Sequence, residues 1–560
     1  MTQWPAWLLW VIPILFFVLF FFIPLGSIFK ITFLERLKQP FTASNWERVW
    51  QTFRFTLLQA SLSMAFTLLL GLPGAYLFSR FKFPAKKILR AASTVPFMMP
   101  TVVVAASFNA LIGPKGLLNY GLMQLFDLQN PPIQLLNTLG AIVLAHVFYN
   151  TSVILRVVGS AWEQLDPQME YAARSLGAST WKTWWKVTFP LLRGSILAAA
   201  MLVFLFDFTS YGVVLLLGGP AFATLEVEIY IQSMQMLNLP LAGLLSVIQL
   251  LFTLVITIGY SRLVSRSGYQ TTPHLQNEAQ RKPHHWREKL FVFVMVVLLF
   301  VLLVSPLVGL SVRSFMRLEA ARGERGAIQT GLTLEYYKAL FQNPRSSIFY
   351  VPPIEAVRNS LVYASITIVI SVVIGMLAAY ALSKKMKINR ILDPVLMLPL
   401  GTSAVTLGLG FIVTFNHPPF DVRSFPLLMP IAHSLVALPF VIRAVLPAIQ
   451  SIPETLRNAA SVLGASPAQV WRHVDLPILS RAAFVGAVFS FTISLGEFGA
   501  TTFLARPEFP TIPIAIYRYL AQPGGLNYGQ AMAMANILML LCGISIYVME
   551  KMQTGTRRQV

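Results

Sequence analysis

Long apolar segments recur along the whole chain, separated by shorter polar stretches. Crossing a ~30 Å hydrocarbon core takes about 20 helical residues, and segments of this length predict membrane spans. Because the segments are continuously apolar rather than alternating, they predict helices and not barrel strands. We therefore expect an all-α integral membrane protein of about twelve spans. They lie near residues 6–26, 55–79, 93–113, 138–160, 193–218, 240–262, 289–312, 360–383, 391–415, 424–446, 480–504 and 530–550.

The charge of the chain supports this topology. Charged residues make up 12% of the 560 residues, about half the share in soluble domains. The net charge of +21 would suggest a nucleic-acid partner in a soluble protein. Here, counting spans from a cytoplasmic N-terminus places the basic stretches 80–90, 262–289, 383–390 and 551–560 on one side, as the positive-inside rule requires. We expect a multi-pass protein of a cell membrane, with both termini cytoplasmic, the lipid bilayer as a partner and no nucleic-acid partner.

One segment occurs twice, as YAARSLGASTWKTWWKVTFPLL (171–192) and as NAASVLGASPAQVWRHVDLPIL (458–479), 287 residues apart. The register persists over about eighty residues, which chance does not maintain. An upstream match, 70–80 with 374–384, has an offset of 304, so the second half lacks 304 − 287 = 17 residues between its second and fourth spans. Identities at the offset of 287 include Ala145/Ala432, His146/His433, Arg156/Arg443, Gly177/Gly464, Trp184/Trp471, Pro190/Pro477, Gly212/Gly499, Pro220/Pro507, Thr224/Thr511 and Tyr230/Tyr517.

The repeat predicts two halves of six spans each, residues 1–264 and 290–560, joined by a polar cytoplasmic linker, 265–289. An even number of spans gives both halves the same orientation, so a pseudo-two-fold axis should lie along the membrane normal with a pathway between the halves.

The repeated loops, residues 162–192 and 449–479, fall on the cytoplasmic side in this topology. Small side chains on one face of a short helix let another surface approach closely, and the prolines are expected to end that helix where the next span begins. The alternative, a pair of alanine-rich connectors, does not explain duplication in register. The candidate docking residues are Ala172, Ala173, Gly177, Pro190, Ala459, Ala460, Gly464 and Pro477.

Both loops resemble the pattern E-A-A-x-x-x-G, nine variable residues, x-L-P, of the membrane permeases of ATP-driven, binding-protein-dependent (ABC-type) importers. The resemblance implies the type I, MetI-like permease architecture, an external solute-binding protein, and a cytoplasmic ATP-binding subunit whose clefts receive the two short helices. By this resemblance the eight docking residues form the ATPase-coupling surfaces. The leading glutamate of the pattern is Tyr171 in one copy and Asn458 in the other. Glu170 lies one position early, about 100° away around a helix.

The chain is expected not to be an enzyme and to need no cofactor. It has no G-x-x-x-x-G-K-[ST] motif and no polar catalytic cluster, so ATP hydrolysis is expected on a separate subunit. The similarity of the two loops favours a homodimer of that subunit. The single cysteine, Cys542, cannot form an intrachain disulfide.

Two carboxylates lie inside predicted spans, Asp207 in the fifth and Glu497 in the eleventh. Ionisable groups within a membrane are functional candidates by default. With Tyr211 and Phe498 as neighbours that could cover an organic cation, they form the predicted substrate pathway. The alternative is that the carboxylates only hydrogen-bond to helix ends.

Four further charged or titratable side chains are paired by the repeat. The histidines His146 and His433 are expected to make hydrogen bonds between helices, and no metal site is assigned to them. The arginines Arg156 and Arg443 are expected to reach the membrane interface.

The substrate is less strongly encoded. Segments 215–230 and 494–517 are similar to external segments of fused twelve-span permeases for thiamine and for ferric iron, and a similar subgroup handles phosphonates. The alternative function is a twelve-helix secondary transporter of the major facilitator type, which would not carry two loops shaped to dock a partner.

Overall fold

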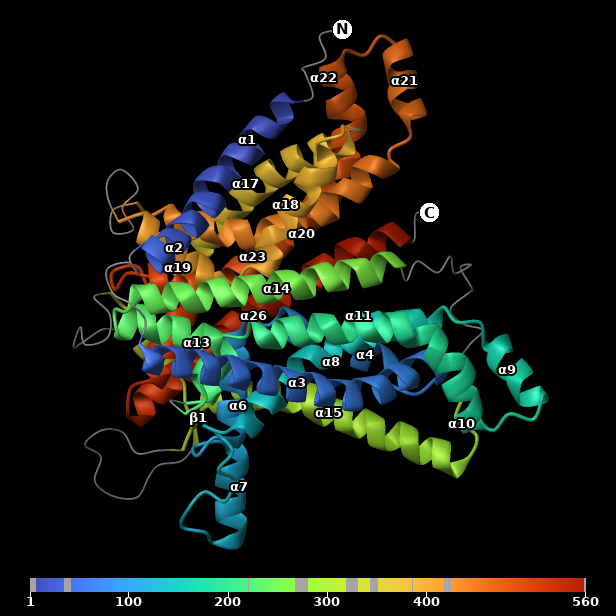
Figure 1. The fold of residues 1–560 in the computed structure, drawn as a ribbon. Helices are drawn as coiled ribbons and strands as arrows, with labels where there is room; N and C mark the ends of the chain where they lie inside the picture. The colour runs from blue at the N-terminus through green and yellow to red at the C-terminus, as the bar shows by residue number, and fades with distance from the viewer. Residues whose placement is uncertain are drawn as a thin grey trace.

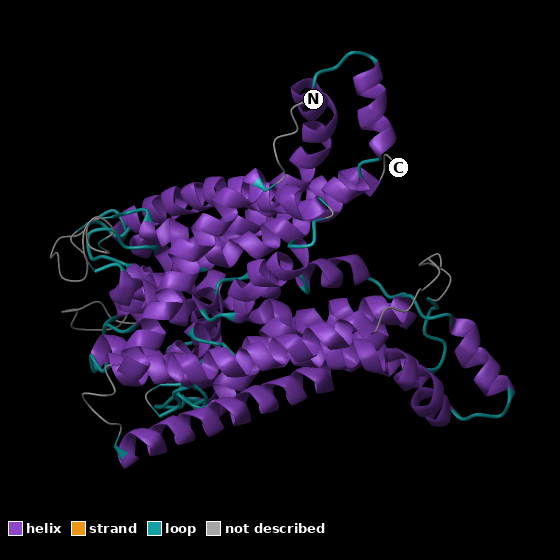
Figure 2. Ribbon diagram, turned by 45° about the horizontal axis from the view of Figure 1, so that its top comes forward, coloured by secondary structure: helices purple, strands orange, loops and turns teal. Residues whose placement is uncertain are grey.

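The computed structural model describes residues 7–34, 42–219, 221–266, 280–318, 331–342, 351–384, 386–416, 421 and 425–557. Within them the chain is almost entirely helical, and long helices lie side by side along one direction (Figures 1 and 2). Sheet within these residues is limited to the antiparallel pair β1 (Met316–Arg317) and β2 (Gly331–Leu332). Helices close their own backbone hydrogen bonds, which an apolar run in lipid requires.

The helices of the first half include two that begin at threonine caps, Thr42 before α3 and Thr138 before α8, whose hydroxyls accept backbone N–H bonds. In order they are α1 (Leu8–Phe17), α2 (Ile23–Leu34), α3 (Ala43–Arg80), α4 (Lys86–Ala92), α5 (Val95–Met98), α6 (Thr101–Ile112), α7 (Leu117–Phe126), α8 (Leu139–Glu163), α9 (Pro167–Ser175), α10 (Thr180–Thr183), α11 (Phe189–Phe208), α12 (Gly212–Leu217), α13 (Leu225–Tyr230) and α14 (Leu239–Arg266).

The second half repeats this order with one extra short helix near its start and a shorter connection later. Its helices are α15 (Trp286–Phe315), α16 (Glu335–Ala339), α17 (Glu355–Ser383), α18 (Asn389–Gly401), α19 (Ala404–Thr414), α20 (Leu428–Ser451), α21 (Glu454–Val462), α22 (Pro467–Val470), α23 (Leu476–Gly496), α24 (Gly499–Leu504), α25 (Ile512–Leu520) and α26 (Gly525–Arg557). Single π-helical turns occur at η1 (Val18–Phe22), η3 (Trp184–Thr188), η4 (Ile231–Gln235) and η5 (Trp471–Asp475).

The prediction of an all-α membrane protein of about twelve spans is confirmed. Among the described residues, 11 helices are long and apolar enough to cross a membrane, or up to 12 if the bent pair α18 and α19 counts as one span. That pair bends by 96° at its break. The predicted span 391–415 is therefore not one straight helix. Its counterpart in the first half is broken at the same place, between α5 and α6.

The first helix of each half packs against the other half. α1 lies along α17, and α2 contacts both α14 and α19. In the same way α15 packs on α6 and touches α3 and α4 of the first half. Figure 1 shows α1 beside α17 and α15 beside α3. The two halves are thus interlocked, although their sequences are separate.

Most of the 17-residue difference between the halves falls in one connection. Residues 113–138 lead from α6 to α8 and carry the extra helix α7, whereas only residues 415–427 lead from α19 to α20. At the predicted linker 265–289, α14 extends to Arg266 and α15 begins at Trp286, so both ends of this segment are helical. Residues 267–279 of the linker lie outside the described residues.

Candidate functional site

The predicted spans five and eleven are both interrupted at their carboxylate-bearing segments. α11 ends at Phe208 and the chain restarts as α12 at Gly212, while α23 ends at Gly496 and restarts as α24 at Gly499. Both restart glycines permit close packing. A Cβ on Gly212 would lie 2.3 Å from Thr101 Oγ1, and one on Gly499 would lie 3.1 Å from Ala404 Cβ. Each short helix can therefore rest on the helix that follows the break in the third span of its own half.

Glu497 caps the second of these breaks. Its Oε1 accepts the N–H of Ala500 at 2.9 Å, and its Oε2 accepts the N–H and the hydroxyl of Thr501 at 2.9 and 2.7 Å. The carboxylate thereby satisfies free N–H groups of the first turn of α24 and lies at the favourable end of its dipole. Oε2 also lies 3.3 Å from Nε2 of His433. Both oxygens are therefore committed to protein partners.

Asp207 differs from Glu497 in having a free oxygen. Its Oδ1 accepts a hydrogen bond of 2.6 Å from Asn150 and lies 3.4 Å from Nδ1 of His146, and its backbone carbonyl accepts from Gln59 at 2.7 Å. Within the described part of the chain, Oδ2 has no hydrogen-bond partner, although the side chain is 1% exposed. A buried acceptor without a partner is costly, which marks Asp207 as a place for an additional group.

The two histidines occupy equivalent places, as the repeat predicted. His146 bridges Ser63 and Ser210, and His433 bridges Ser494 and Thr501, with N···O distances of 2.8 to 3.1 Å. These contacts confirm the expectation of hydrogen bonds between helices. Each histidine also approaches the carboxylate of its own half, through Nδ1 of His146 and through Nε2 of His433. The two carboxylates are not equivalent, because Glu497 aligns with Ser210.

The arginines Arg156 and Arg443 are both exposed, and their place at the membrane interface stays a prediction. Arg156 places its guanidinium 5.9 Å from the ring of Phe97, and Arg443 pairs with Asp393 at 3.3 Å.

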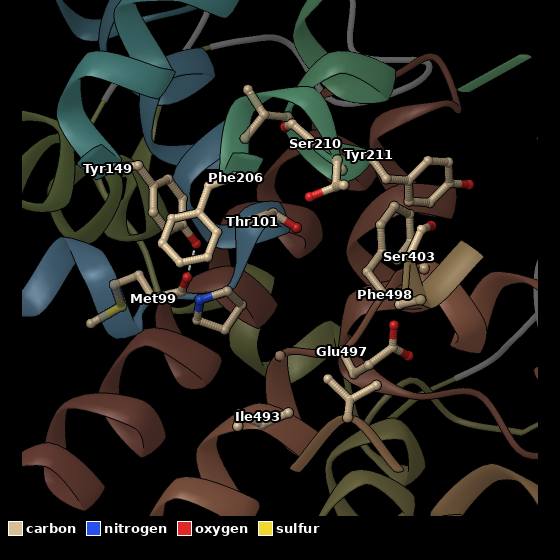
Figure 3. A pocket seen from close by; sticks show the side chains of 18 of the residues that line it. Met99, Thr101, Tyr149, Phe206, Ser210, Tyr211, Ser403, Ile493, Glu497 and Phe498 are labelled. Carbon is tan, nitrogen blue, oxygen red and sulfur yellow. Dashed lines mark hydrogen bonds between the residues drawn. The ribbon is translucent and has the colours of Figure 1, made fainter. Parts of the chain in front are cut away.

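Aromatic rings meet where the two breaks face each other. The rings of Tyr211 and Phe498 stack with centroids 5.3 Å apart and an interplanar angle of 29°. Tyr230 packs on Tyr211 at 5.8 Å, and Tyr517 packs on Phe498 at 5.6 Å. Figure 3 shows Tyr211 and Phe498 side by side, with Glu497 next along the chain. The four rings form a symmetric row across the junction of the halves.

A cavity of about 390 Å³ lies beside this row. It is lined by residues of both halves, including all four predicted pathway residues, Asp207, Tyr211, Glu497 and Phe498. From the aromatic row its wall continues along α11 to Phe206 and along α23 to Phe489, towards the end of the bundle that carries α9 and α21. In Figure 3 the hydroxyl of Tyr149 donates to the carbonyl of Met99 across one wall.

Sequence reasoning did not select several polar residues of this lining. Glu226 is 1% exposed; its Oε2 accepts from Ser403 Oγ at 2.5 Å across the two halves, and its Oε1 accepts from Gln249. Asn150, the partner of Asp207, was also missed. An acidic residue in the apolar run 224–230 was an available signal for Glu226, whereas nothing in the sequence distinguishes Asn150 or Ser403.

The repeated loops form short helices, α9 and α21, that protrude from one end of the bundle and stand well apart (Figure 1). Both helices are fully described, and neither has a buried residue. Ala172 and Ala459 are exposed, and the equivalent leucines at the helix ends, Leu176 and Leu463, are 89% and 87% exposed. Large apolar side chains exposed at equivalent places in both copies form a surface suited to a partner.

Gly177 and Gly464 do not belong to a small-residue helical face. They follow the ends of α9 and α21 with φ of +82° and +83°, and space for a Cβ is open at both. The N–H of the next residue, Ala178 or Ala465, bonds back to the carbonyl of Ala173 or Ala460 at 3.1 and 3.0 Å. These glycines are left-handed helix caps. Their place in the coupling surface stays a prediction.

The expectation that Pro190 and Pro477 end a helix is wrong. Helix continues from Thr180 to Phe208 and from Pro467 to Gly496. Each proline lies in the first turn of α11 or α23, directly after a π-helical turn, η3 or η5. The wider turn accommodates the missing N–H of proline without a break in the helix.

Each protruding helix is anchored by one ion pair, with inverted charge. Glu170 of α9 accepts from Arg80 at 2.8 Å and from Thr188 at 3.0 Å. At the position equivalent to Glu170, Arg457 of α21 donates to Asp475 at 2.8 Å. Although both loops lack the leading glutamate of the pattern, at Tyr171 and Asn458, the first helix still has an acidic anchor one residue earlier.

The duplicated bundle, the cavity between its halves and the two protruding helices define a polytopic transport protein built from two equivalent halves. Its sequence matches the family of binding-protein-dependent transport system inner membrane components twice, over residues 67–269 and 371–555. These matches cover more than half of the chain, which belongs to this family. It is the membrane-spanning permease of an ABC importer, and the major facilitator alternative is set aside.

Several known proteins resemble the chain over most of its length. The thiamine transport system permease protein of Brucella abortus (strain 2308) is 25% identical over 502 residues, covering 88% of this chain and 86% of the relative. That of Escherichia coli (strain K12) is 24% identical over 517 residues, covering 90% and 89%. A probable ABC transporter permease protein of Sinorhizobium fredii is 25% identical over 485 residues, covering 85% and 81%.

Proposed function

We propose that this chain forms the translocation pathway for thiamine. The similarity to thiamine permeases of several bacteria supports this substrate, and so does the chemistry of the cavity. Thiamine is an aromatic organic cation, and a buried carboxylate beside aromatic rings is complementary to such a group. A ferric-iron or phosphonate substrate has no comparable support from the relatives named above.

The observation that carries the proposal is the unpartnered Oδ2 of Asp207 in the wall of the cavity. Among the described residues this oxygen is buried without a hydrogen-bond partner, which is unfavourable for a polar group. A cationic solute in the cavity supplies the missing interaction. Glu497 contributes through the shape of the break rather than by direct contact, because both of its oxygens are used.

The stacked pair Tyr211 and Phe498 acts as the outer gate of this pathway, closed in the present structure. The cavity wall runs from this pair towards α9 and α21, so the solute site faces the side on which those helices protrude. In the proposed orientation this side is cytoplasmic and both termini lie there, which agrees with the basic stretches of the sequence.

Two partners complete the proposed cycle. A homodimeric ATP-binding subunit receives α9 and α21 in equivalent clefts, and an extracytoplasmic binding protein delivers thiamine to the opposite end. When ATP draws the two subunits together, α9 and α21 approach each other, and the interlocked halves rotate to part Tyr211 from Phe498. The proposed halves are residues 1–264 and 290–560, with the repeated loops as the coupling elements.

Uptake by the reconstituted transporter tests the proposal. Asp207→Asn keeps an acceptor for Asn150 and removes the charge, so thiamine uptake is expected to fall by about tenfold or more, as loss of one charged contact implies. Glu228→Gln is the matched control, because Glu228 is a buried carboxylate paired with Arg48 and is absent from the residues lining the cavity. Uptake unchanged in Asp207→Asn, or lost equally in both variants, would contradict the pathway assignment. A recovered binding protein loaded with ferric iron would overturn the substrate.

A further inference from the structure

A second candidate binding site lies at a corner of the protein, where the linker between the two halves leads into α15. The end of the linker pairs with the end of α3: Lys82 N–H donates to the carbonyl of Arg281 at 2.9 Å, and Arg281 N–H donates to that of Arg80 at 3.0 Å. These two backbone bonds fix Lys82 of the first half beside Lys282, which precedes the second half.

The corner encloses a groove of about 610 Å³ between the α3–α4 turn, the end of the linker and α15. We name it the basic groove. Its polar rim carries Lys82, Lys282 and Lys289, all three exposed, and its floor includes Val292, Phe293 and Val296 of α15. Phe293 is 66% exposed although it is apolar. The groove thus joins a cluster of positive charge to an apolar strip that continues along a spanning helix.

The acidic side chain near the groove is already paired with an arginine. The acidic residue of this corner is Glu288, whose two oxygens accept from the two terminal nitrogens of Arg281 at 3.1 and 2.5 Å and from the N–H of His284 at 3.0 Å. Arg281 also lies over the ring of Phe81 at 5.4 Å. No acidic side chain is among the described residues that line the basic groove. The positive charge of the three lysines is therefore available to an external anion.

The level of the groove along the bundle agrees with the headgroup region. Trp286, the first residue of α15, is 68% exposed, with Arg287 5.7 Å from its ring. An exposed tryptophan beside basic residues at the start of a span is typical of the membrane interface. Lys289 lies about one turn further along α15 than Trp286, and the apolar residues Val292, Phe293 and Val296 follow it in the same helix.

We propose that the basic groove binds an anionic phospholipid of the cytoplasmic leaflet. The phosphate lies between Lys82, Lys282 and Lys289, and an acyl chain lies along Val292, Phe293 and Val296. The lipid joins the α3–α4 turn of the first half to the start of α15 in the second half, and it helps to hold the interlocked halves together. The side of the membrane rests on the proposed orientation of the permease, but the binding site does not depend on transport.

Native mass spectrometry of the full chain in neutral detergent, with added phosphatidylglycerol or phosphatidylcholine, tests this proposal. The wild type is expected to retain phosphatidylglycerol preferentially. The triple variant Lys82→Gln, Lys282→Gln, Lys289→Gln should lose the preference, since each lysine near a membrane surface contributes roughly fivefold to anionic-lipid affinity. The corresponding triple arginine variant should keep it. This arginine variant shows that any loss follows charge rather than misfolding.

The control removes three cations from the equivalent turn of the second half, as Lys384→Gln, Lys387→Gln, Arg390→Gln. It should retain the lipid preference. An equal loss in this control, or an unchanged preference in the groove variant, would overturn the proposal. Competition by soluble glycerol phosphate as effective as that by the lipid would also overturn it, because the site would then be one for small anions. None of these outcomes depends on whether thiamine is the substrate.

Discussion

Tyr211 and Phe498 occupy equivalent positions of the two halves, and their rings stack with centroids 5.3 Å apart where the halves meet. Each ring belongs to the last residue before its helix restarts, and a His–carboxylate contact lies at each break. Because one ring belongs to each half, a rotation of one half against the other changes the distance between the rings. The pair is therefore placed to sense the relative arrangement of the halves.

Removing either ring should open the outer gate. In Tyr211→Ala and in Phe498→Ala, we expect thiamine to leak from loaded proteoliposomes without ATP, and ATP hydrolysis to proceed without the binding protein. Tyr211→Phe keeps the ring and should remain tight. Leak from Tyr211→Phe equal to that from Tyr211→Ala would indicate that the hydroxyl, not the stack, closes the pathway.

Glu497 should prove to be structural where Asp207 is functional. Glu497→Gln removes one of the acceptors at the first turn of α24, and loss of such a cap costs about 1 kcal/mol. We expect a lower thermal unfolding temperature for Glu497→Gln and little change for Asp207→Asn. Uptake measured per folded molecule should show the reverse order. If both variants unfold at the wild-type temperature, the capping role is wrong.

The two cap glycines should respond to backbone conformation rather than to side-chain volume. At φ near +82° a residue with a Cβ is strained by about 1 kcal/mol, and asparagine tolerates the left-handed region best. Gly177→Asn and Gly464→Asn should therefore retain more ATP-coupled uptake than the alanine variants, although asparagine is larger. Gly121→Ala, in α7 with open space around it, serves as control. If uptake instead decreases with the volume of the introduced side chain, these glycines belong to a contact surface.

The inverted anchors of α9 and α21 should tolerate exchange of charge. Glu170→Arg places two cations together and loses a charged hydrogen bond of about 2 kcal/mol, so coupling of ATP hydrolysis to uptake should fall. Combining it with Arg80→Glu should restore part of the coupling. In the second half an arginine already stands at the position of Glu170, as Arg457, where its partner is Asp475 at the position of Thr188. No recovery in the double variant would mean that Arg80 or Glu170 contacts another partner.

Much of the architecture could be predicted from hydropathy and the internal repeat, because long apolar runs and a constant register determine the spans and their duplication. The bends in the spanning helices could not be predicted from these patterns. The 96° break between α18 and α19 lies in a continuously apolar segment, where only packing selects the turn. The exchange of α1 and α15 between halves also depends on contacts between distant segments.

The candidate site shows the same division. Asp207 and Glu497 were identifiable because charge in a span is rare. The different hydrogen bonding of the two carboxylates could not be predicted. It depends on which backbone N–H groups and amide side chains pack against each carboxylate in the folded protein. The π-helical turns before Pro190 and Pro477 were likewise hidden, because proline after a helical segment usually marks its end.

Cross-linking in native membranes identifies what α9 and α21 contact. Ala172→Cys and Ala459→Cys introduce exposed thiols, and the single native cysteine, Cys542, is fully buried and should stay unlabelled. A maleimide photo-crosslinker on each thiol, activated in native membranes and followed by mass spectrometry, identifies the neighbour. We expect the same ATP-binding subunit at both positions and none at Gly121→Cys in α7. Reproducible cross-links to lipid alone at both positions, in membranes that still import thiamine, would contradict this expectation.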